Sequence, residues 1–212
     1  MDNNFVRAKS KKNKEIRMQE IIDVTDRLFH TLTYHDITLS IISKETKITR
    51  GGLYKYISSK EEIFLMIYLK KQKAMINDLL AELNKNIITI QTLSETFSKI
   101  AYEHLDLFKY HQILNAIIET NVSIEKLAEF KKATQKDIYD FLKIIANLTN
   151  TNQQTAFDTY LTIMYHCVYL YARVAYYDNY VQAMALANLV IEPCDFIKEL
   201  NHFITILLKN IN

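Results

Sequence analysis

Residues Ile48 to Phe64 read ITRGGLYKYISSKEEIF and hold both glycines of this 212-residue chain. Thr38 is placed to cap one short helix, and Thr49 is placed to cap a second, even shorter one. Two short helices joined by a turn of three or four residues form a helix-turn-helix motif. Gly51 and Gly52 then fall on the first turn of the second helix, where glycine lets another molecule approach the backbone closely.

Helices on either side of this motif complete a compact unit. Upstream, from about Lys12 to Thr31, apolar residues recur at helical spacing; they are Ile16, Ile21, Ile22, Val24, Leu28 and Phe29. Downstream, Ser59 and Glu62 have the spacing of a capping box. The spacing therefore predicts a longer fourth helix that begins at Ser59.

Glycine and proline are so rare that the whole chain is expected to be mostly helical. Two glycines, one proline and 49% hydrophobic residues exclude a sandwich of hairpin-linked strands and leave enough apolar side chains for a sizeable core. We expect polar interruptions at residues 84–86, 120–123, 147–152 and 178–179, and a last helix from Pro193 to about Lys209. The predicted fold is all-α, with a helix-turn-helix domain at residues 1–63 joined by a linking helix to a larger helical domain at residues 64–212.

The charge is unevenly distributed along the chain. Residues 1–63 hold 12 Lys and Arg against 9 Asp and Glu, a net charge of +3, whereas residues 64–212 hold 14 against 15, a net charge of −1. The basic excess lies near the N-terminus, at Arg7, Lys9, Lys11, Lys12, Lys14 and Arg17. Such a run is either a solvated arm or a surface for a phosphate backbone.

Several classes of protein find no support in the sequence. Charges interrupt the apolar stretches before about 18 residues, and the N-terminus lacks the apolar segment of a signal peptide, so we expect no membrane partner and a cytoplasmic location. Cys167 and Cys194 belong to no CxxC pair and are predicted to be free, buried thiols. No catalytic motif, metal-ligand spacing or phosphate-binding loop is present, so we expect no enzyme activity, metal or cofactor.

The segment from about Glu15 to Phe64 resembles the DNA-binding domain of the TetR/AcrR family of bacterial transcriptional regulators. The resemblance rests on IDVTDRLF at residues 22–29, ITL at 37–39, IS at 42–43 and, above all, ITRGGLYKYISSKEEIF at 48–64. The chain departs from the family pattern at Thr33 and Lys47, where glycine is common, at Gly52, where Thr or Ala is common, and at Ile57, where phenylalanine is frequent. Lys47 needs a left-handed or otherwise adjusted turn.

The resemblance implies that the motif binds double-stranded operator DNA. The residues predicted to contact DNA are Thr38, Thr49, Arg50, Gly51, Gly52, Tyr54, Lys55, Tyr56 and Lys60. By resemblance, the two threonines are helix caps that also touch phosphate, the two tyrosines reach the DNA backbone, and Lys60 anchors a phosphate. Arg50 and Lys55 are the predicted base readers because both can address guanine acceptors in the major groove. The alternatives are that Tyr56 packs inside the unit and that Lys60 is only a solvated charge.

The helix predicted from about Gln153 to Tyr177 carries two stripes of different character. One follows the alternating spacing of a helix seam; it consists of Ala156, Tyr160, Ile163, Cys167, Leu170 and Val174, and Phe196, Leu200, Phe203 and Leu207 repeat it in the last helix. In the resembling family, these two helices of each subunit form a four-helix dimer interface. The seam is therefore predicted to hold a homodimer, and the alternative is that it faces the core of its own subunit.

The opposite stripe mixes polar and aromatic side chains, namely Asp158, Thr162, Tyr165, His166, Tyr169 and Arg173. Polar groups held inside a protein need partners, and several that converge on a cavity make a binding site. We interpret Tyr165, His166, Tyr169 and Arg173 as one wall of a site for a largely apolar small-molecule effector. His104 is predicted to complete this site, because it falls on the apolar face marked by Phe97, Ala101 and Phe108. The alternative is a core histidine satisfied by its neighbours.

Taken together, these features predict a homodimeric, ligand-responsive transcriptional regulator, a repressor of unidentified operator and effector. The alternative from another class is an all-helical protein that binds DNA constitutively or organises the nucleoid. A cavity beside His166 would favour the first hypothesis, and a filled core there would favour the second.

Overall fold

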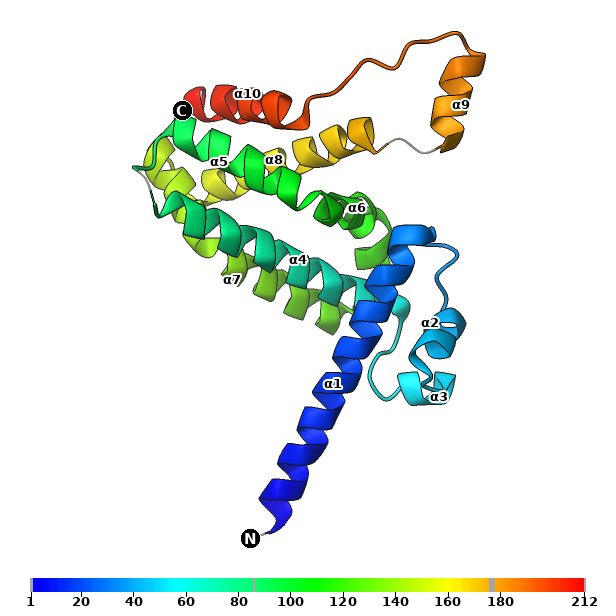
Figure 1. The fold of residues 1–212 in the computed structure, drawn as a ribbon. Coiled ribbons are helices and arrows are strands. Elements are labelled where there is room, and N and C mark those ends of the chain that lie inside the picture. The colour runs from blue at the N-terminus through cyan, green and yellow to red at the C-terminus, as the bar shows by residue number, and fades with distance from the viewer. Residues whose placement is uncertain (1, 86, 176–177, 212) are drawn as a thin grey trace. The chain divides into compact units, whose positions relative to one another are not determined.

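Every regular element is a helix in the part of the chain that the computed structural model describes, which is residues 2–85, 87–175 and 178–211. The α-helices, labelled in Figure 1, are α1 (Asp2–Thr31), α2 (Leu39–Thr46), α3 (Arg50–Leu53), α4 (Lys60–Leu83), α5 (Ile90–Glu103), α6 (Leu105–Ile113), α7 (Ile124–Thr149), α8 (Gln153–Val174), α9 (Asp178–Leu186) and α10 (Phe196–Lys209). A π-helical turn, η1 (Leu114–Ile118), and a 3-10 turn, η2 (Glu119–Asn121), follow α6. The all-α prediction is confirmed.

The chain forms two compact units that do not coincide with the predicted domains. The first unit contains the residues up to Lys70 together with Ile113–Lys131, and the second contains Lys71–Gln112 and the residues from Lys132 onward. Helices α4 and α7 therefore each begin in the first unit and end in the second. The functional division at residue 63 stays a prediction.

The core of the first unit forms where α1, the segment after it and α4 meet. The Phe64 ring lies edge-on to the rings of Phe29 and Tyr34, with centroid distances of 5.1 and 5.4 Å. Leu53 and Ile57 are buried in the same unit, as expected of the apolar residues of the motif. Burial of these side chains holds the short helices in place, since a four-residue helix such as α3 is not stable by itself.

The local signals around α2 and α3 are confirmed. The Thr38 hydroxyl accepts from the amide of Ile41 at 3.3 Å, and the Thr49 hydroxyl accepts from the amide of Gly52 at 3.1 Å. Lys47 ends α2 in the left-handed conformation with φ of 55°. This conformation costs a lysine more than a glycine, so the turn is locally strained.

The start of α4 differs in one detail from a capping box. The Ser59 hydroxyl accepts from the amide of Glu62 at 3.4 Å, as predicted. The Glu62 carboxylate, however, accepts from the amide of Ser58 at 3.0 Å, one residue earlier than the motif requires. Both bonds still satisfy amides at the helix start, where intrahelical acceptors are missing.

The second unit is built from the later parts of α4 and α7 with α5, α6, α8 and α10. Its core includes the rings of Phe97, Phe141 and Tyr160, and α10 packs against α5 and α8. The Gln72 side-chain amide donates to the buried Tyr160 hydroxyl at 2.9 Å. Cys167 is fully buried and burial raises its pKa, whereas Cys194 is only partly buried. The prediction of a buried thiol thus holds for Cys167 alone.

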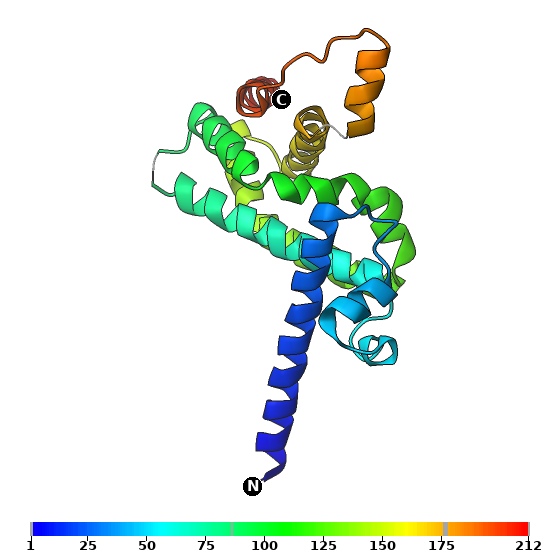
Figure 2. The ribbon, with the colours of Figure 1, turned by 45° about the vertical axis from the view of Figure 1, so that its right-hand side comes forward.

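Several element boundaries differ from the sequence expectations. Asp178 begins α9, where an interruption was expected, and α10 begins after Asp195, whose carboxylate accepts from the amide of Lys198 at 3.1 Å. Pro193 therefore lies before the helix that it was predicted to start. The expected end of α8 at Tyr177 falls outside the described residues. Figure 1 shows α9 standing apart from α8 and α10 of the same unit, and in Figure 2 it is again clear of α10.

Candidate nucleic-acid interface

The start of α3 is the exposed end of a helix-turn-helix. Thr49 caps this helix, and Arg50 and Gly51 next to it are exposed. The Arg50 guanidinium lies 3.5 Å from the Tyr54 hydroxyl, and Tyr54 is 50% exposed. Because α3 ends at Leu53, Tyr54 caps its C-terminal end, and Lys55 and Tyr56 lie in the turn beyond it. Lys55 is exposed, whereas Tyr56 is half-buried, as the packing alternative allows.

The two glycines of α3 have different surroundings. A Cβ atom added to Gly51 would meet nothing within 4 Å. A Cβ atom on Gly52 would lie 2.9 Å from Cγ2 of Ile48 and 3.1 Å from the hydroxyl oxygen of Thr49. A side chain on Gly52 would thus press on Ile48 and on the Thr49 cap. A side chain on Gly51 would instead project away from the protein, into the space outside its surface.

The side chain of Lys60, the first residue of α4, binds the segment that leads into α2. Its ammonium group donates to the carbonyl oxygens of Tyr34 at 2.7 Å and Ile37 at 2.8 Å, and lies 3.8 Å from the centroid of the Tyr34 ring. The Tyr34 hydroxyl in turn donates to the Glu61 carboxylate. We call these four residues, Tyr34, Ile37, Lys60 and Glu61, the Lys60 clasp.

The electrostatics of the Lys60 clasp agree with a partly buried cluster. Burial lowers the pKa of Lys60, and the Glu61 charge opposes that effect. Burial and the hydrogen bond to Glu61 both raise the pKa of Tyr34. An ammonium group has three donors, and two of those of Lys60 are already used inside the protein. The predicted alternative of a solvated charge does not describe this side chain, and its phosphate contact stays a prediction.

Sequence reasoning missed Tyr34, Ile37 and Glu61. The neighbouring opposite charges of Lys60 and Glu61 at a helix start were visible in the sequence. Their targets were not, because Tyr34 lies 26 residues earlier and Lys60 binds a backbone oxygen there, which carries no sequence signal.

The α8 stripe predicted to line an effector site lies on an exposed face of α8, where His166 and Arg173 contact α10 and the Tyr165 ring lies edge-on to the ring of His111. Tyr165 and Tyr169 are 49% and 55% exposed. The His166 ring stacks on Phe203 of α10 with a centroid distance of 3.7 Å, and Arg173 donates to Glu199 of α10 at 2.6 Å. We call the apolar and aromatic side chains of this surface the α8–α10 face; they are Tyr165, His166, Tyr169, Phe203 and Ile206.

The seam predicted to hold the dimer is inside the subunit instead. Ala156, Tyr160, Ile163, Cys167 and Leu170 are all buried in a single chain, and so are Phe196 and Leu200 of α10. The prediction that this seam meets a second subunit is wrong for these residues, which lie in the subunit's own core as the alternative has it. Val174, Phe203 and Leu207, the other members of the predicted seam, are not buried, and their contact with a second subunit stays a prediction. Periodic spacing marks a stripe that packs, but it does not identify what the stripe packs against.

His104 is not brought to the α8 stripe. It ends α5, and its Nε2 atom lies 2.9 Å from a carboxylate oxygen of Asp78 on α4. The helix breaks at His104, so the face marked by Phe97 and Ala101 does not continue through it. The prediction that His104 completes a site with α8 is therefore replaced by a hydrogen bond with Asp78 of α4.

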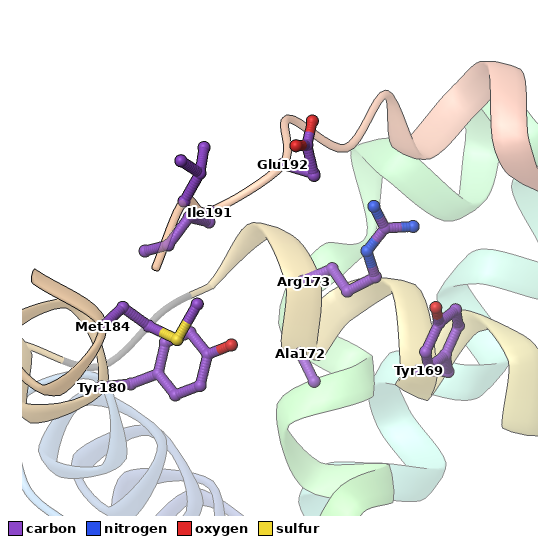
Figure 3. Close-up of a pocket in the computed structure, with 8 residues that line it drawn as sticks. Tyr169, Ala172, Arg173, Tyr180, Met184, Ile191 and Glu192 are labelled. Carbon is purple, nitrogen blue, oxygen red and sulfur yellow. The ribbon is translucent and has the colours of Figure 1, made fainter. Parts of the chain in front are cut away.

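A hollow of about 550 Å³ lies between the end of α8 and the segment that carries α9. Figure 3 shows Tyr169, Ala172 and Arg173 on its α8 side and Tyr180 and Met184 on α9, with Ile191 and Glu192 on the connection to α10. Only two of the predicted effector residues, Tyr169 and Arg173, are among its lining residues.

Two families of known proteins match nearly the whole chain. The family of bacterial regulatory proteins called tetR matches residues 21–67, and the family described as the tetracyclin repressor-like C-terminal domain matches residues 69–209. The chain belongs to the TetR family of bacterial regulators. The predicted family is confirmed, and TetR-family proteins are DNA-binding transcriptional regulators.

Two solved structures are similar to the chain over most of its length. The chain is similar to the fatty acid degradation regulator FadR from Bacillus halodurans, with a TM-score of 0.55 and 13% identity over 92% of this chain and 96% of that one. It is also similar to a Clostridium perfringens protein proposed to regulate fatty acid metabolism, with a TM-score of 0.48 and 16% identity over 91% of this chain and 98% of that one. At 13% identity, the similarity to the Bacillus halodurans structure shows the fold alone. No curated protein sequence matches the chain.

Neither a membrane segment nor a metal site is found among the residues that the structure describes. None of their helices is long and apolar enough to span a bilayer. No three His, Cys, Asp or Glu side chains gather there in a way that could hold a metal ion.

The two glycines are expected to respond differently to alanine. Gly51→Ala should keep or raise the free energy of unfolding, by up to about 1 kcal/mol, because alanine favours the helix and meets no neighbour. It should still weaken DNA binding by roughly tenfold, because the methyl group occupies the space that DNA approaches. Gly52→Ala should show no such stabilisation, since its Cβ presses on the Thr49 cap. Urea denaturation and fluorescence anisotropy with a labelled operator measure both effects, and a destabilised Gly51→Ala protein would refute the assignment.

Replacing Lys60 separates the clasp from a phosphate anchor. Lys60→Met should lower the free energy of unfolding by about 1–3 kcal/mol, because two carbonyl oxygens lose a charged donor. DNA affinity should fall at every salt concentration, and the salt slope should be shallower by about 0.9 because the third donor no longer reaches phosphate. A Lys60 side chain that serves only as a phosphate anchor predicts the same change of slope with near-normal stability. Lys55→Met, which removes the same charge from an exposed position of the same unit, is the matched control for stability.

Proposed function

We propose that this TetR-family chain is a homodimeric transcriptional repressor that binds a two-fold operator through the start of α3 and responds to a small effector. The observation that carries the proposal is the capped start of α3, where Thr49 fixes the first turn and Gly51 leaves the backbone open to an approaching duplex. A recognition helix of a helix-turn-helix contacts base edges with its N-terminal residues.

Arg50 and Lys55 are the proposed base readers. Both are exposed, and both can bind the acceptor atoms of guanine in the major groove. Thr38, Thr49, Tyr54 and Tyr56 are proposed to contact the sugar-phosphate backbone, which positions the motif without reading sequence. The third donor of the Lys60 ammonium group is the only part of that side chain proposed to reach phosphate.

The dimer is proposed to form through the α8–α10 face. Tyr165, Tyr169 and Ile206 are 49%, 55% and 48% exposed, and an apolar surface of this kind on two adjacent helices marks a protein interface. Tyrosine suits such a position because its ring is buried by a partner while its hydroxyl keeps a hydrogen bond. A two-fold dimer also presents two α3 helices to two half-sites.

The response to an effector is supported by polar atoms in the core of the second unit. The Oε1 atom of Gln72 and the hydroxyl of Thr134 are buried, and neither has a hydrogen-bond partner among the described residues. Buried polar atoms in native proteins are nearly always paired, with protein groups, ordered water or a ligand, and the Gln72 acceptor is here proposed to pair with a ligand donor. The hollow beside α9 is not lined by His166, whose ring stacks on Phe203, so these two buried atoms and not a cavity beside His166 support the effector hypothesis over the constitutive alternative.

The dimer and the operator are tested in one experiment. DNA selected from a random duplex pool by the wild-type protein should contain two inverted half-sites centred about one helical turn, or a multiple of it, apart. Tyr169→Glu should be monomeric in sedimentation equilibrium and should lose the selected site, because a charge enters an apolar interface. The matched control is Tyr139→Glu on α7, a tyrosine of similar exposure outside the α8–α10 face, which should remain dimeric. A wild-type monomer, or selected DNA without repeated half-sites, would contradict the proposal.

The effector is tested by titrating the operator complex with lipophilic cations, neutral aromatics and aromatic acids. At least one class of compound should change DNA affinity. Gln72→Met should then raise the concentration for half-maximal effect roughly tenfold, because the buried acceptor is lost, while affinity for DNA alone stays unchanged. Ser98→Ala is the control, since the Ser98 hydroxyl is buried in the same unit but already donates to the Ser94 carbonyl. If no compound acts, the constitutive alternative is the better hypothesis.

A further inference from the structure

The segment between α8 and α10 carries apolar side chains that a free monomer leaves exposed to water. Helix α9 contains nine residues, none of which is buried. Tyr180 and Val181 are 46% and 43% exposed, and Leu186, Leu189 and Val190 are 86%, 59% and 78% exposed. Isolated helices shorter than about 12 residues are marginal in water. A nine-residue helix without a buried face therefore needs a partner to persist.

A small molecule in the adjoining hollow does not meet this need. The hollow of about 550 Å³ has the size of a ligand site, and Met184 and Ile191 of the segment line it. Val181, Leu186 and Leu189 are not among its lining residues. A ligand there would leave these side chains in water, so the occupant must be large enough to cover both sides of the segment.

We propose that residues 178–193, which we call the arm, pack on a second copy of this chain. This inference rests on the dimer proposed above, because the arm continues the α8–α10 face. It leaves the end of α8 and returns to the start of α10, and Tyr169 and Arg173 of α8 line the hollow beneath it. In a dimer formed through that face, the arm of one subunit lies beside the other subunit, whose side chains fill the hollow.

The charges of the arm agree with this partner. The arm carries Asp178 and Glu192 and has no Lys or Arg, whereas α10 exposes Lys198 and Lys209. Opposite charges at the rim of an interface favour the correct pairing more than they add affinity. The apolar residues Leu186, Leu189 and Val190 are then the source of binding energy, because their burial removes apolar surface from water.

The experiment compares Leu186→Asp with Ile87→Asp. Leu186 and Ile87 are 86% and 85% exposed, so the two variants place the same charge on equally exposed aliphatic positions, inside and outside the arm. Sedimentation equilibrium should show a dimer dissociation constant at least about tenfold higher for Leu186→Asp and an unchanged constant for Ile87→Asp. Circular dichroism at a protein concentration where both variants are dimeric should show the same helix content in both.

Hydrogen exchange gives the second measurement. Amides of residues 179–190 should be protected in the wild-type dimer and should exchange at unprotected rates in monomeric Tyr169→Glu. Equal dissociation constants for the two Asp variants, or arm protection that persists in the monomer, contradict the proposal that the arm packs on a second subunit. Neither result contradicts the proposed dimer. A wild-type protein that is monomeric overturns the proposed dimer and the arm together.

Discussion

One ammonium group fixes the start of α4 to the segment from which the DNA-reading motif begins. Lys60 holds the carbonyl oxygens of Tyr34 and Ile37, and Thr38, the cap of α2, follows directly. The cap sets where α2 starts, the left-handed Lys47 sets where it ends, and α3 begins two residues later at its own cap. Further along α4, Gln72 binds Tyr160 of α8. An effector can act on this helix only by binding two of its arrangements with different affinities.

The features that were predictable from sequence depend on neighbours a few residues away. Thr38 and Thr49 cap their helices because a side-chain oxygen reaches an amide three residues away. The positive φ of Lys47 was expected from the family pattern, in which glycine is common at this position. The family motif added the DNA-reading roles, which no local rule supplies. Neither the local rules nor the family motif predicts the role of Gly52, because it depends on where the Ile48 side chain lies in space.

The larger unit was harder to predict because its partners are distant in sequence. The pattern of α8 contains two stripes, and helical period alone does not say which of them faces the core. Cys167 and Leu170 face inward, while Tyr165 and Tyr169 face outward, the reverse of the interpretation that tyrosines and polar groups enclose a ligand. No glycine or proline marks the break at His104 or the start of the separate helix α9, so neither boundary was predictable from the sequence.

The reactivity of the Cys167 thiol reports whether α8 is packed in the core of the second unit. The sulfur is fully buried in α8, and burial raises the pKa of its thiol, so the reactive thiolate is scarce while the subunit is closed. Cys194, on the connection to α10, is partly accessible. Oxidants and alkylating reagents therefore reach the two thiols in a fixed order, and modification of Cys167 marks only those molecules in which α8 has left the core.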